Sequence, residues 1–311
     1  MKNIILRVDK VPEVLAEQLS SDYTLYEYEK LSVEEFSAIV GKVQVILASG
    51  ESKVAASLIN QLPALKLIAV FGVGYDGVDI HAAFQRNIQV TNTPDILTDD
   101  VADLSMAMML AVSRQIIGAQ KFIERGGWQS GNYPQTTKVS GGRLGIVGFG
   151  RIGRAVAQRA KGFAMRIGYF DKYRADNEEC IYYPDLIELA RDSDVLMVCA
   201  SGGAQSAKLI NSDVLAALGP QGILINIARG SVVDEAALVD AISHQRIAGA
   251  GLDVFADEPN VPPALLNRDN VVITPHIGSA TRATRAAMAR LVIDNIAAFY
   301  ADAPLLTAVT K

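Results

Sequence analysis

Cysteine, tryptophan and histidine are the scarce residues of this 311-residue chain, which holds two, one and three of them respectively. Cys180 and Cys199 show no metal-ligand spacing, so the sequence predicts reduced thiols and no metal site. No run approaches the roughly eighteen uncharged apolar residues of a membrane span. The opening MKNIILRVDKVPEV is too poor in apolar residues for a signal peptide. We therefore expect a cytoplasmic protein without a membrane segment.

An excess of positive charge is also missing. The 29 Lys and Arg residues are outnumbered by 34 Asp and Glu, which gives a net charge of -5. This balance argues against nucleic acid or an anionic membrane surface as the main partner. Half of the residues are apolar and a fifth are charged, as in a globular protein with a sizeable core. The length favours two domains.

Short apolar strands alternate with helical patterns, which predicts an α/β fold with parallel sheets. Four strands are expected in the first third, at NIILRV, VQVILAS, LKLIAVFGV and IQVTN. Six more follow in the second half, at RLGIVG, MRIGYFD, DVLMVCA, GILINIA, IAGAGLDVF and NVVITP. Six is the number in a complete dinucleotide-binding sheet, so we expect two doubly wound parallel-sheet domains, one of them a Rossmann domain.

Two helices define the domain organisation. Residues 99–117 are apolar almost all round and predict one buried helix between layers or domains. The amphipathic stretch at 282–301 is expected to pack back on the first domain and make it discontinuous. The predicted domains are 1–98 with 284–311, which binds substrate, and 99–283, which binds a dinucleotide.

A glycine-rich turn predicts the cofactor site. Gly148, Gly150 and Gly153 have G-x-G-x-x-G spacing between a strand and a helix, and Asp171 ends the next strand. Such glycines permit a tight turn, close approach of a pyrophosphate and close packing of helix on strand. An acid at Asp171 suits the ribose 2′-hydroxyl of NAD. Lys172 and the nearby Arg174 leave NADP open, and a purely structural turn is the alternative.

Three ionisable residues follow strands in the second half: Arg229, Glu258 and His276. Singly, each is explained by a solvated cation, a turn or a local hydrogen bond. Together they provide a carboxylate-binding cation, an acid that favours imidazolium, and a proton donor, which is what reduction of a 2-keto acid needs. The small residues Gly278 and Ser279 would leave room for the nicotinamide beside the histidine.

The first domain is expected to supply the remaining substrate contacts. Small residues end a strand at FGVGYDGVD, where the backbone N–H groups of Val73 and Gly74 could hold an anion. Ser49 and Gly50 end the preceding strand. A plain β-turn is the alternative. A pocket between the two domains would exclude water from the reaction.

Several motifs together resemble the D-isomer-specific 2-hydroxyacid dehydrogenase family. They are FGVGYDGVDI, VTNTPDILTDDVAD, GIVGFGRIG, LINIARGSVVDEAAL, GAGLDVFADEP and TPHIGSAT, in this order. The resemblance implies a flavodoxin-like substrate domain, Arg229 as the substrate-binding cation, His276 as the acid/base and Glu258 as its partner. The expected cofactor contacts are Thr98, Gly148, Gly150, Arg151, Ile152, Gly153, Asp171, Lys172, Ala200, Ile227, Ala228, Asp253, Gly278 and Ser279.

Within that family RGGW, YYPDL, LGPQGILINIARG and PLLTAV are most similar to the glyoxylate/hydroxypyruvate reductase branch, which includes hydroxyphenylpyruvate reductases. This implies homodimers in which Trp128 reaches toward the partner's site; a tryptophan packed in a loop is the alternative. Two segments depart from the branch. SGGAQSAK replaces a Pro-Leu-Thr-like turn on the adenine side, and Asp171–Lys172 replaces a pair suited to NADPH.

The function expected is reduction of glyoxylate, hydroxypyruvate or hydroxyphenylpyruvate to the D-hydroxy acid with NAD(P)H. A nucleotide-sensing interaction module with little turnover, as in related transcriptional co-repressors, is the alternative. The chain has no low-complexity extension for partners, which weighs against that reading. Formate dehydrogenases of this kind carry glutamine where Glu258 stands, which disfavours that activity.

Overall fold

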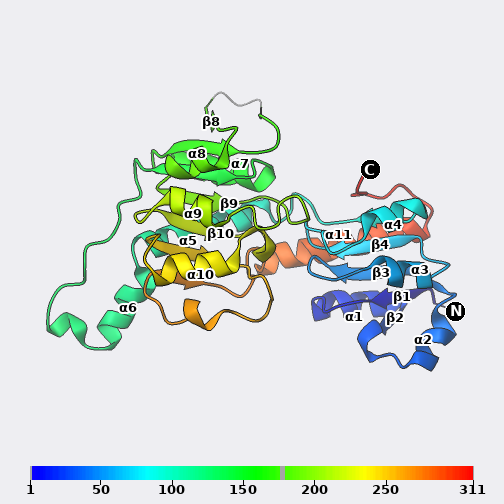
Figure 1. Ribbon diagram of the computed structural model, residues 1–311. Coiled ribbons are helices and arrows are strands. Elements are labelled where there is room, and N and C mark those ends of the chain that lie inside the picture. Colours follow the sequence, from blue (N-terminus) through cyan, green and yellow to red (C-terminus); the bar gives the residue numbers. More distant parts are fainter. Residues whose placement is uncertain (1, 176–178, 311) are drawn as a thin grey trace. The chain divides into compact units, whose positions relative to one another are not determined.

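The computed structural model describes residues 2–175 and 179–310 and divides the chain into two compact units (Figure 1). The first unit is Met1–Leu97 with Thr281–Lys311, and the second is Thr98–Ala280. These divisions fall one residue before the first predicted domain boundary and three before the second. Residues 1 and 311 of the predicted substrate domain lie outside the described residues.

The first unit contains a five-stranded sheet in the order β2-β1-β3-β4-β5, with every neighbouring pair parallel. The strands are β1 (Ile4–Arg7), β2 (Thr24–Glu27), β3 (Val43–Ser49), β4 (Leu67–Phe71) and β5 (Gln89–Thr91). The helices are α1 (Glu13–Asp22), α2 (Val33–Ile39), α3 (Ala56–Gln61), α4 (Ile80–Gln85) and α11 (Arg282–Tyr300), with a 3₁₀ turn η1 (Tyr28–Lys30). All five residues of β4 are buried, as expected for a central strand covered on both faces.

The second unit contains a seven-stranded parallel sheet in the order β12-β11-β10-β9-β6-β7-β8. The strands are β6 (Arg143–Val147), β7 (Arg166–Phe170), β8 (Ile181–Tyr182), β9 (Val195–Val198), β10 (Ile223–Asn226), β11 (Gly249–Leu252) and β12 (Val271–Ile273). The α-helices are α5 (Thr98–Ser113), α6 (Ile116–Glu124), α7 (Arg151–Lys161), α8 (Leu186–Arg191), α9 (Ser212–Leu218) and α10 (Glu235–Ser243). Short 3₁₀ turns are η2 (Gly127–Gln129), η3 (Gly230–Val232) and η4 (Pro263–Leu265).

The predicted fold class is confirmed: both sheets are parallel and doubly wound. The sheet order of the second unit reverses direction between β6 and β9, which is the switch point where such sheets bind ligands. Each sheet has one strand more than expected from the sequence, β2 and β8. Both are edge strands without a fully buried residue, so neither produces an apolar run in the sequence.

The prediction of one helix over 99–117 was wrong in its length. The helix α5 ends at Ser113, Gln115 takes a left-handed conformation with φ 46°, and α6 then begins a new direction at Ile116. The helix α5 packs closely on β11, as its predicted burial requires: a Cβ on Gly249 of β11 would lie 2.9 Å from Val112 of α5. Among the described residues no single helix is long and apolar enough to cross a membrane; α5 and α6 meet those criteria only jointly, across a 54° bend.

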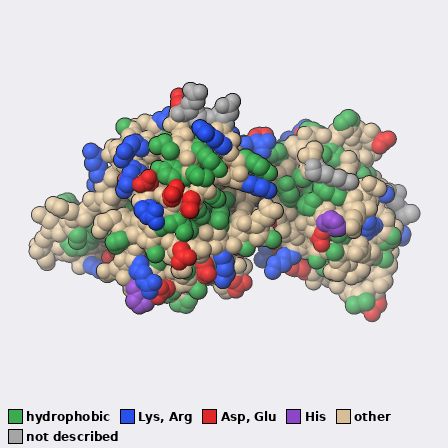
Figure 2. Space-filling view, turned by 45° about the horizontal axis from the view of Figure 1, so that its top comes forward, with side chains coloured by type: hydrophobic (Ala, Val, Ile, Leu, Met, Phe, Trp, Pro, Cys, Tyr) green, Lys and Arg blue, Asp and Glu red, His purple; other side chains and the backbone are tan. Residues whose placement is uncertain are grey.

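The helix α11 belongs to the first unit, where it packs on β4 and α1. It begins after Thr281, whose hydroxyl accepts a hydrogen bond from the Thr284 backbone N–H, as an N-cap does. Beyond α11 the chain returns to β5, where Thr91 pairs with Ala308. On the face of the molecule in Figure 2, acidic and basic side chains are interspersed.

Candidate active site

The carboxyl ends of β10, β11 and β12 bring the three predicted catalytic residues to one edge of the second sheet. Arg229 follows β10, Glu258 follows β11 and His276 follows β12. Because the strands are parallel neighbours, the loops after them emerge on the same side. The arrangement therefore does not depend on closeness in sequence.

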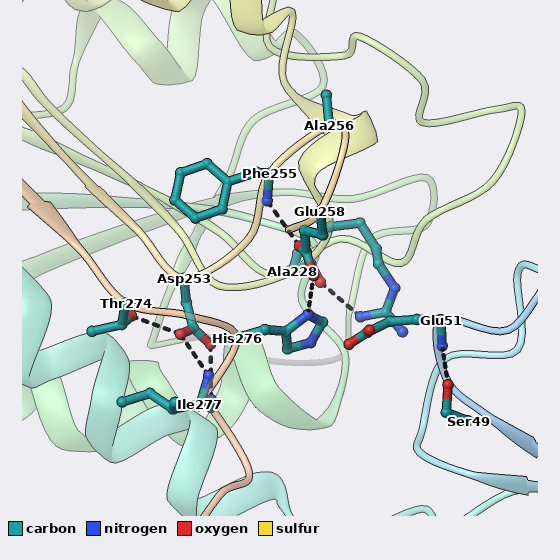
Figure 3. Close-up of polar contacts among 12 residues, drawn as sticks. Ser49, Glu51, Ala228, Asp253, Phe255, Ala256, Glu258, Thr274, His276 and Ile277 are labelled. Atoms are coloured by element: carbon teal, nitrogen blue, oxygen red, sulfur yellow. Dashed lines mark hydrogen bonds and ion pairs between the residues drawn. The ribbon is translucent and has the colours of Figure 1, made fainter. Parts of the chain in front are cut away.

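His276 and Glu258 form a direct pair (Figure 3). Nδ1 of His276 lies 2.8 Å from Oε2 of Glu258, and the other carboxylate oxygen accepts a hydrogen bond of 2.9 Å from the Phe255 backbone N–H. The two side chains are 27% and 24% exposed, so both remain accessible to a small molecule. His276 has a left-handed φ of 50°, which is uncommon for a residue other than glycine and typical of strained functional positions. A carboxylate on Nδ1 fixes the orientation of the imidazole ring.

Asp253, at the end of β11, organises the loop that carries His276. Its side chain is buried, and it accepts hydrogen bonds from the Thr274 hydroxyl at 2.6 Å and from the backbone N–H groups of Ile277 and Gly278 at 2.8 Å each. Its carbonyl also accepts from the His276 N–H at 2.9 Å. Figure 3 shows the bonds from Thr274 and Ile277 meeting at the Asp253 carboxylate. Hydrogen bonds to Asp253 thus fix the conformation of the loop that carries His276.

Arg229 is held in a turn built by Asn226. The Asn226 side chain donates to the Arg229 carbonyl at 3.0 Å and accepts from the Ala228 N–H at 3.1 Å. Nη1 of Arg229 donates to the Ala228 carbonyl at 2.8 Å. A Cβ on the next residue, Gly230, would lie 1.9 Å from the Phe255 carbonyl, so only glycine lets the turns after β10 and β11 approach this closely.

The glycine-rich turn between β6 and α7 has the geometry that a dinucleotide requires. Gly148 has a φ of +91°, and a Cβ on Gly153 would lie 2.3 Å from the Gly148 carbonyl. A Cβ on Gly150 would meet nothing within 4 Å, which leaves space for a ligand at the helix start. Among the described residues, no side chain caps this N-terminus, which begins with Arg151 and Ile152. The residues present therefore fit a bound pyrophosphate.

Asp171 follows β7, next to the same turn. Its Oδ2 accepts a hydrogen bond of 2.6 Å from the Phe149 backbone N–H, which fixes the carboxylate beside the glycines. Lys172 lies over the ring of Tyr173, with 5.4 Å between Nζ and the ring centroid. The acid is thus anchored at the glycine turn, whereas the lysine is exposed and directed to a neighbouring side chain.

The end of β9 contacts the turn from the other side. A Cβ on Gly148 would lie 2.6 Å from the Ala200 Cα. Burial raises the pKa of the adjacent Cys199 thiol to about 12, which disfavours the reactive thiolate form. The divergent segment Ser201–Ser206 closes on itself, because the Ser206 hydroxyl donates to the Ser201 carbonyl at 2.6 Å. Among the other predicted cofactor residues, Ile227 is buried, whereas Ala228, Thr98 and Ser279 are half-buried.

The predicted substrate residues of the first unit lie at the carboxyl edge of its own sheet. The Gly50 N–H donates to the Phe71 carbonyl at 3.1 Å, which joins the ends of β3 and β4, and Ser49 ends β3. Asn92 donates to the Val73 carbonyl at 2.9 Å and braces the loop. Within residues 2–175 and 179–310, the N–H groups of Val73 and Gly74 donate to no acceptor, as an anion-binding loop requires.

Two residues that support the catalytic turns, Asn226 and Thr274, were missed in the sequence. Asn226 is the last residue of the apolar strand β10, in ILIN, and Thr274 directly follows the apolar strand β12, in VVIT. A polar side chain in such a run must find a partner, and here the partners are the Arg229 turn and Asp253. That interruption of the apolar pattern is the signal that could have identified them.

Comparison with known proteins agrees with this geometry. The family model for the NAD binding domain of the D-isomer specific 2-hydroxyacid dehydrogenases matches residues 106–278, more than half of the chain. A 2-ketogluconate reductase of Gluconobacter oxydans is 44% identical and a hydroxyphenylpyruvate reductase of Plectranthus scutellarioides 42% identical, each over 98% of both chains. The structure of an NADPH-dependent glyoxylate/hydroxypyruvate reductase of Sinorhizobium meliloti, in complex with NADP and malonate, is 40% identical. It superposes with a TM-score of 0.93 over 100% of this chain and 97% of that one.

These matches confirm the family, its glyoxylate/hydroxypyruvate reductase branch and the NAD(P) cofactor that the sequence predicted. The chain belongs to the D-isomer-specific 2-hydroxyacid dehydrogenase family and is an NAD(P)-dependent enzyme that reduces 2-keto acids to 2-hydroxy acids.

Proposed function

We propose that this enzyme reduces glyoxylate, hydroxypyruvate and bulkier 2-keto acids such as hydroxyphenylpyruvate to the D-2-hydroxy acids, with NADH as the preferred reductant. The observation that carries the proposal is the 2.8 Å pair of His276 and Glu258 at the edge of a nucleotide-binding sheet. Relatives described as glyoxylate, hydroxypyruvate and hydroxyphenylpyruvate reductases support this choice of substrates.

In this proposal His276 is the acid and Arg229 the anchor. Glu258 holds Nδ1, so the proton for the substrate carbonyl oxygen is carried on Nε2. The Arg229 guanidinium binds the substrate carboxylate through paired hydrogen bonds and so orients the carbonyl group. The cofactor supplies the hydride when bound. The loop held by Asp253 gives the imidazole a fixed position during this step.

We assign cofactor binding to the second unit and substrate selection to the first. In the second unit the glycine turn and Asp171 support the nucleotide assignment. In the first unit the N–H groups of Val73 and Gly74 donate to no acceptor among the described residues. Their position near Ser49 and Gly50 supports binding of an anionic substrate. The remaining predicted cofactor contacts, including Thr98, Lys172, Ala200 and Ser279, stay predictions.

We also propose a cytoplasmic homodimer. Four large apolar side chains are exposed in the short segment from α6 to η2: Ile116, Ile117, Ile123 and Trp128. Trp128 is 68% exposed, so it is not packed within its own unit. A contiguous exposed apolar segment is typical of a protein interface. In the dimer Trp128 would reach toward the substrate of the partner subunit.

The direct test is the loss of reduced-nicotinamide absorbance on addition of each keto acid, with NADH and NADPH in parallel. We expect turnover with at least one of glyoxylate, hydroxypyruvate and 4-hydroxyphenylpyruvate, and a higher kcat/KM for NADH. Tight cofactor binding without turnover of any keto acid would contradict the proposal and favour a nucleotide-sensing module.

A further inference from the structure

Arg285 lies at the carboxyl edge of the first unit's sheet. It is the fourth residue of α11, and its guanidinium carbon lies 5.4 Å from the ring centroid of Phe71, the last residue of β4. The loop that follows Phe71 contains Val73 and Gly74, whose N–H groups donate to no acceptor within residues 2–175 and 179–310. The cation is therefore placed beside the proposed substrate loop.

The surroundings of Arg285 do not satisfy its charge. Burial lowers the pKa of the guanidinium, and the Glu51 carboxylate opposes this effect only in part. In the described part of the chain, no oxygen accepts a hydrogen bond from Arg285 and no carboxylate lies within 4.0 Å of it. By contrast, Arg290 on the same helix is paired with Asp294 at 3.0 Å. A half-buried cation without an acceptor is costly, and such groups persist where a ligand completes them.

The same sheet edge also offers hydroxyl groups and acids. The hydroxyls of Ser49 and Ser52 lie 3.0 Å apart, and both donate to Oδ2 of Asp9, at 3.4 and 3.3 Å. The Glu51 N–H donates to the Ser49 hydroxyl at 3.3 Å, as Figure 3 shows. The end of β3 and the residues after it thus carry two hydroxyl groups, with the Asp9 carboxylate beside them. Asp9 and Glu51 would repel a second carboxylate on a substrate, whereas hydroxyl groups can donate to these acids and accept from the arginine.

We propose that Arg285 is a substrate-binding residue that donates hydrogen bonds to hydroxyl groups on the tail of the 2-keto acid, so that the enzyme favours keto acids derived from sugars. This inference rests on the proposed function and names its substrate class. Phe71 provides the flat surface that holds the guanidinium toward the tail. A purely structural Arg285 would contribute packing on Phe71 and would not distinguish hydroxylated from plain tails.

The test compares two six-carbon substrates, 2-ketogluconate and 2-ketohexanoate, which differ in the hydroxyl groups of the tail. We expect Arg285→Met to lower the ratio of their kcat/KM values by about tenfold or more, as loss of a hydrogen bond from a charged donor does. Arg285→Lys, which keeps a cation above Phe71, is expected to lower the ratio less. Arg282→Met removes an exposed cation from the same helix and should leave the ratio unchanged.

A ratio that is unchanged in Arg285→Met and Arg285→Lys would overturn the inference, even if both substrates become slower together. If Arg285→Met does not fold, as judged by its melting temperature, the lysine variant gives the answer: an unchanged ratio there overturns the inference. Failure of the proposed function is distinguishable, because the wild-type enzyme would then turn over neither substrate nor glyoxylate.

Discussion

At the scale of single residues, the buried carboxylate of Asp253 is the group on which the geometry of His276 depends. It is 1% exposed and accepts three hydrogen bonds from the segment between Thr274 and Gly278. Two of these bonds come from backbone N–H groups, which the substitution of a side chain does not remove. The third comes from the Thr274 hydroxyl and can be removed alone.

Replacing Thr274 with valine keeps the shape of the side chain and removes that hydroxyl. A hydrogen bond to a charged group contributes about 1.5–3 kcal/mol, so we expect kcat for keto-acid reduction to fall about tenfold or more as the His276 loop loses its fixed position. Steady-state kinetics of Thr274→Val and Thr274→Ser measure this. Thr274→Ser keeps the hydroxyl and should retain most of the activity; equal losses in both variants would contradict the role of the hydrogen bond.

Asp171 carries the proposed preference for NADH. Its carboxylate is fixed by the Phe149 N–H and would repel the 2′-phosphate of NADPH. Asp171→Asn removes the charge at nearly constant shape, so the ratio of kcat/KM for NADPH to that for NADH should rise by about tenfold. The ratio is measured at saturating keto acid, with Asp192→Asn, an acid elsewhere in the unit, as control. An unchanged ratio would remove Asp171 from cofactor selection.

At the scale of the elements, the apolar pattern predicted the inner strands and the edge strands β5 and β12, and it missed the edge strands β2 and β8. The strands β3, β4, β6, β9 and β10 are buried on both faces and therefore appear in the sequence as apolar runs. Edge strands β2 and β8 bury less and leave no such run. The break between α5 and α6 depends on the left-handed Gln115, a conformation that composition does not reveal.

The part of the site that could be predicted from the sequence consists of ionisable residues that follow predicted strands. Histidine is scarce in this chain, so His276 was conspicuous, and Arg229 and Glu258 follow the neighbouring strands β10 and β11. Asn226 and Thr274 act through hydrogen bonds to residues that are near them only in the folded sheet. Arg285 escaped prediction for a similar reason, because its position over Phe71 follows from the packing of α11 on β4.

The glycine turn gives a test at the level of an element. A Cβ on Gly153 would lie 2.3 Å from the Gly148 carbonyl and force α7 away from β6, so Gly153→Ala should lower both the melting temperature and NADH affinity. A Cβ on Gly150 would meet nothing within 4 Å, so Gly150→Ala should weaken NADH binding by about tenfold without lowering the melting temperature. Unchanged NADH affinity in Gly150→Ala, measured by fluorescence titration, would place the pyrophosphate elsewhere.

At the scale of the whole molecule, the exposed apolar side chains from Ile116 to Trp128 predict association. Ile123 is 57% exposed on α6, and a glutamate there would place an unpaired charge in the proposed interface. We expect sedimentation equilibrium to give a dimer for the wild type and a shift toward monomer for Ile123→Glu. Val33 is 78% exposed in the first unit, and Val33→Glu should remain dimeric. A monomeric wild type would contradict the dimer.

The central claim is that His276 donates the proton in keto-acid reduction, and one measurement tests it directly. The turnover of glyoxylate is measured in His276→Ala, with His244→Ala, an exposed histidine paired with Asp240, as the matched control. General acid catalysis accounts for about a hundredfold or more in rate, so we expect a loss of that size in His276→Ala with NADH affinity retained, and normal turnover in His244→Ala. Near-normal turnover in His276→Ala would contradict the account.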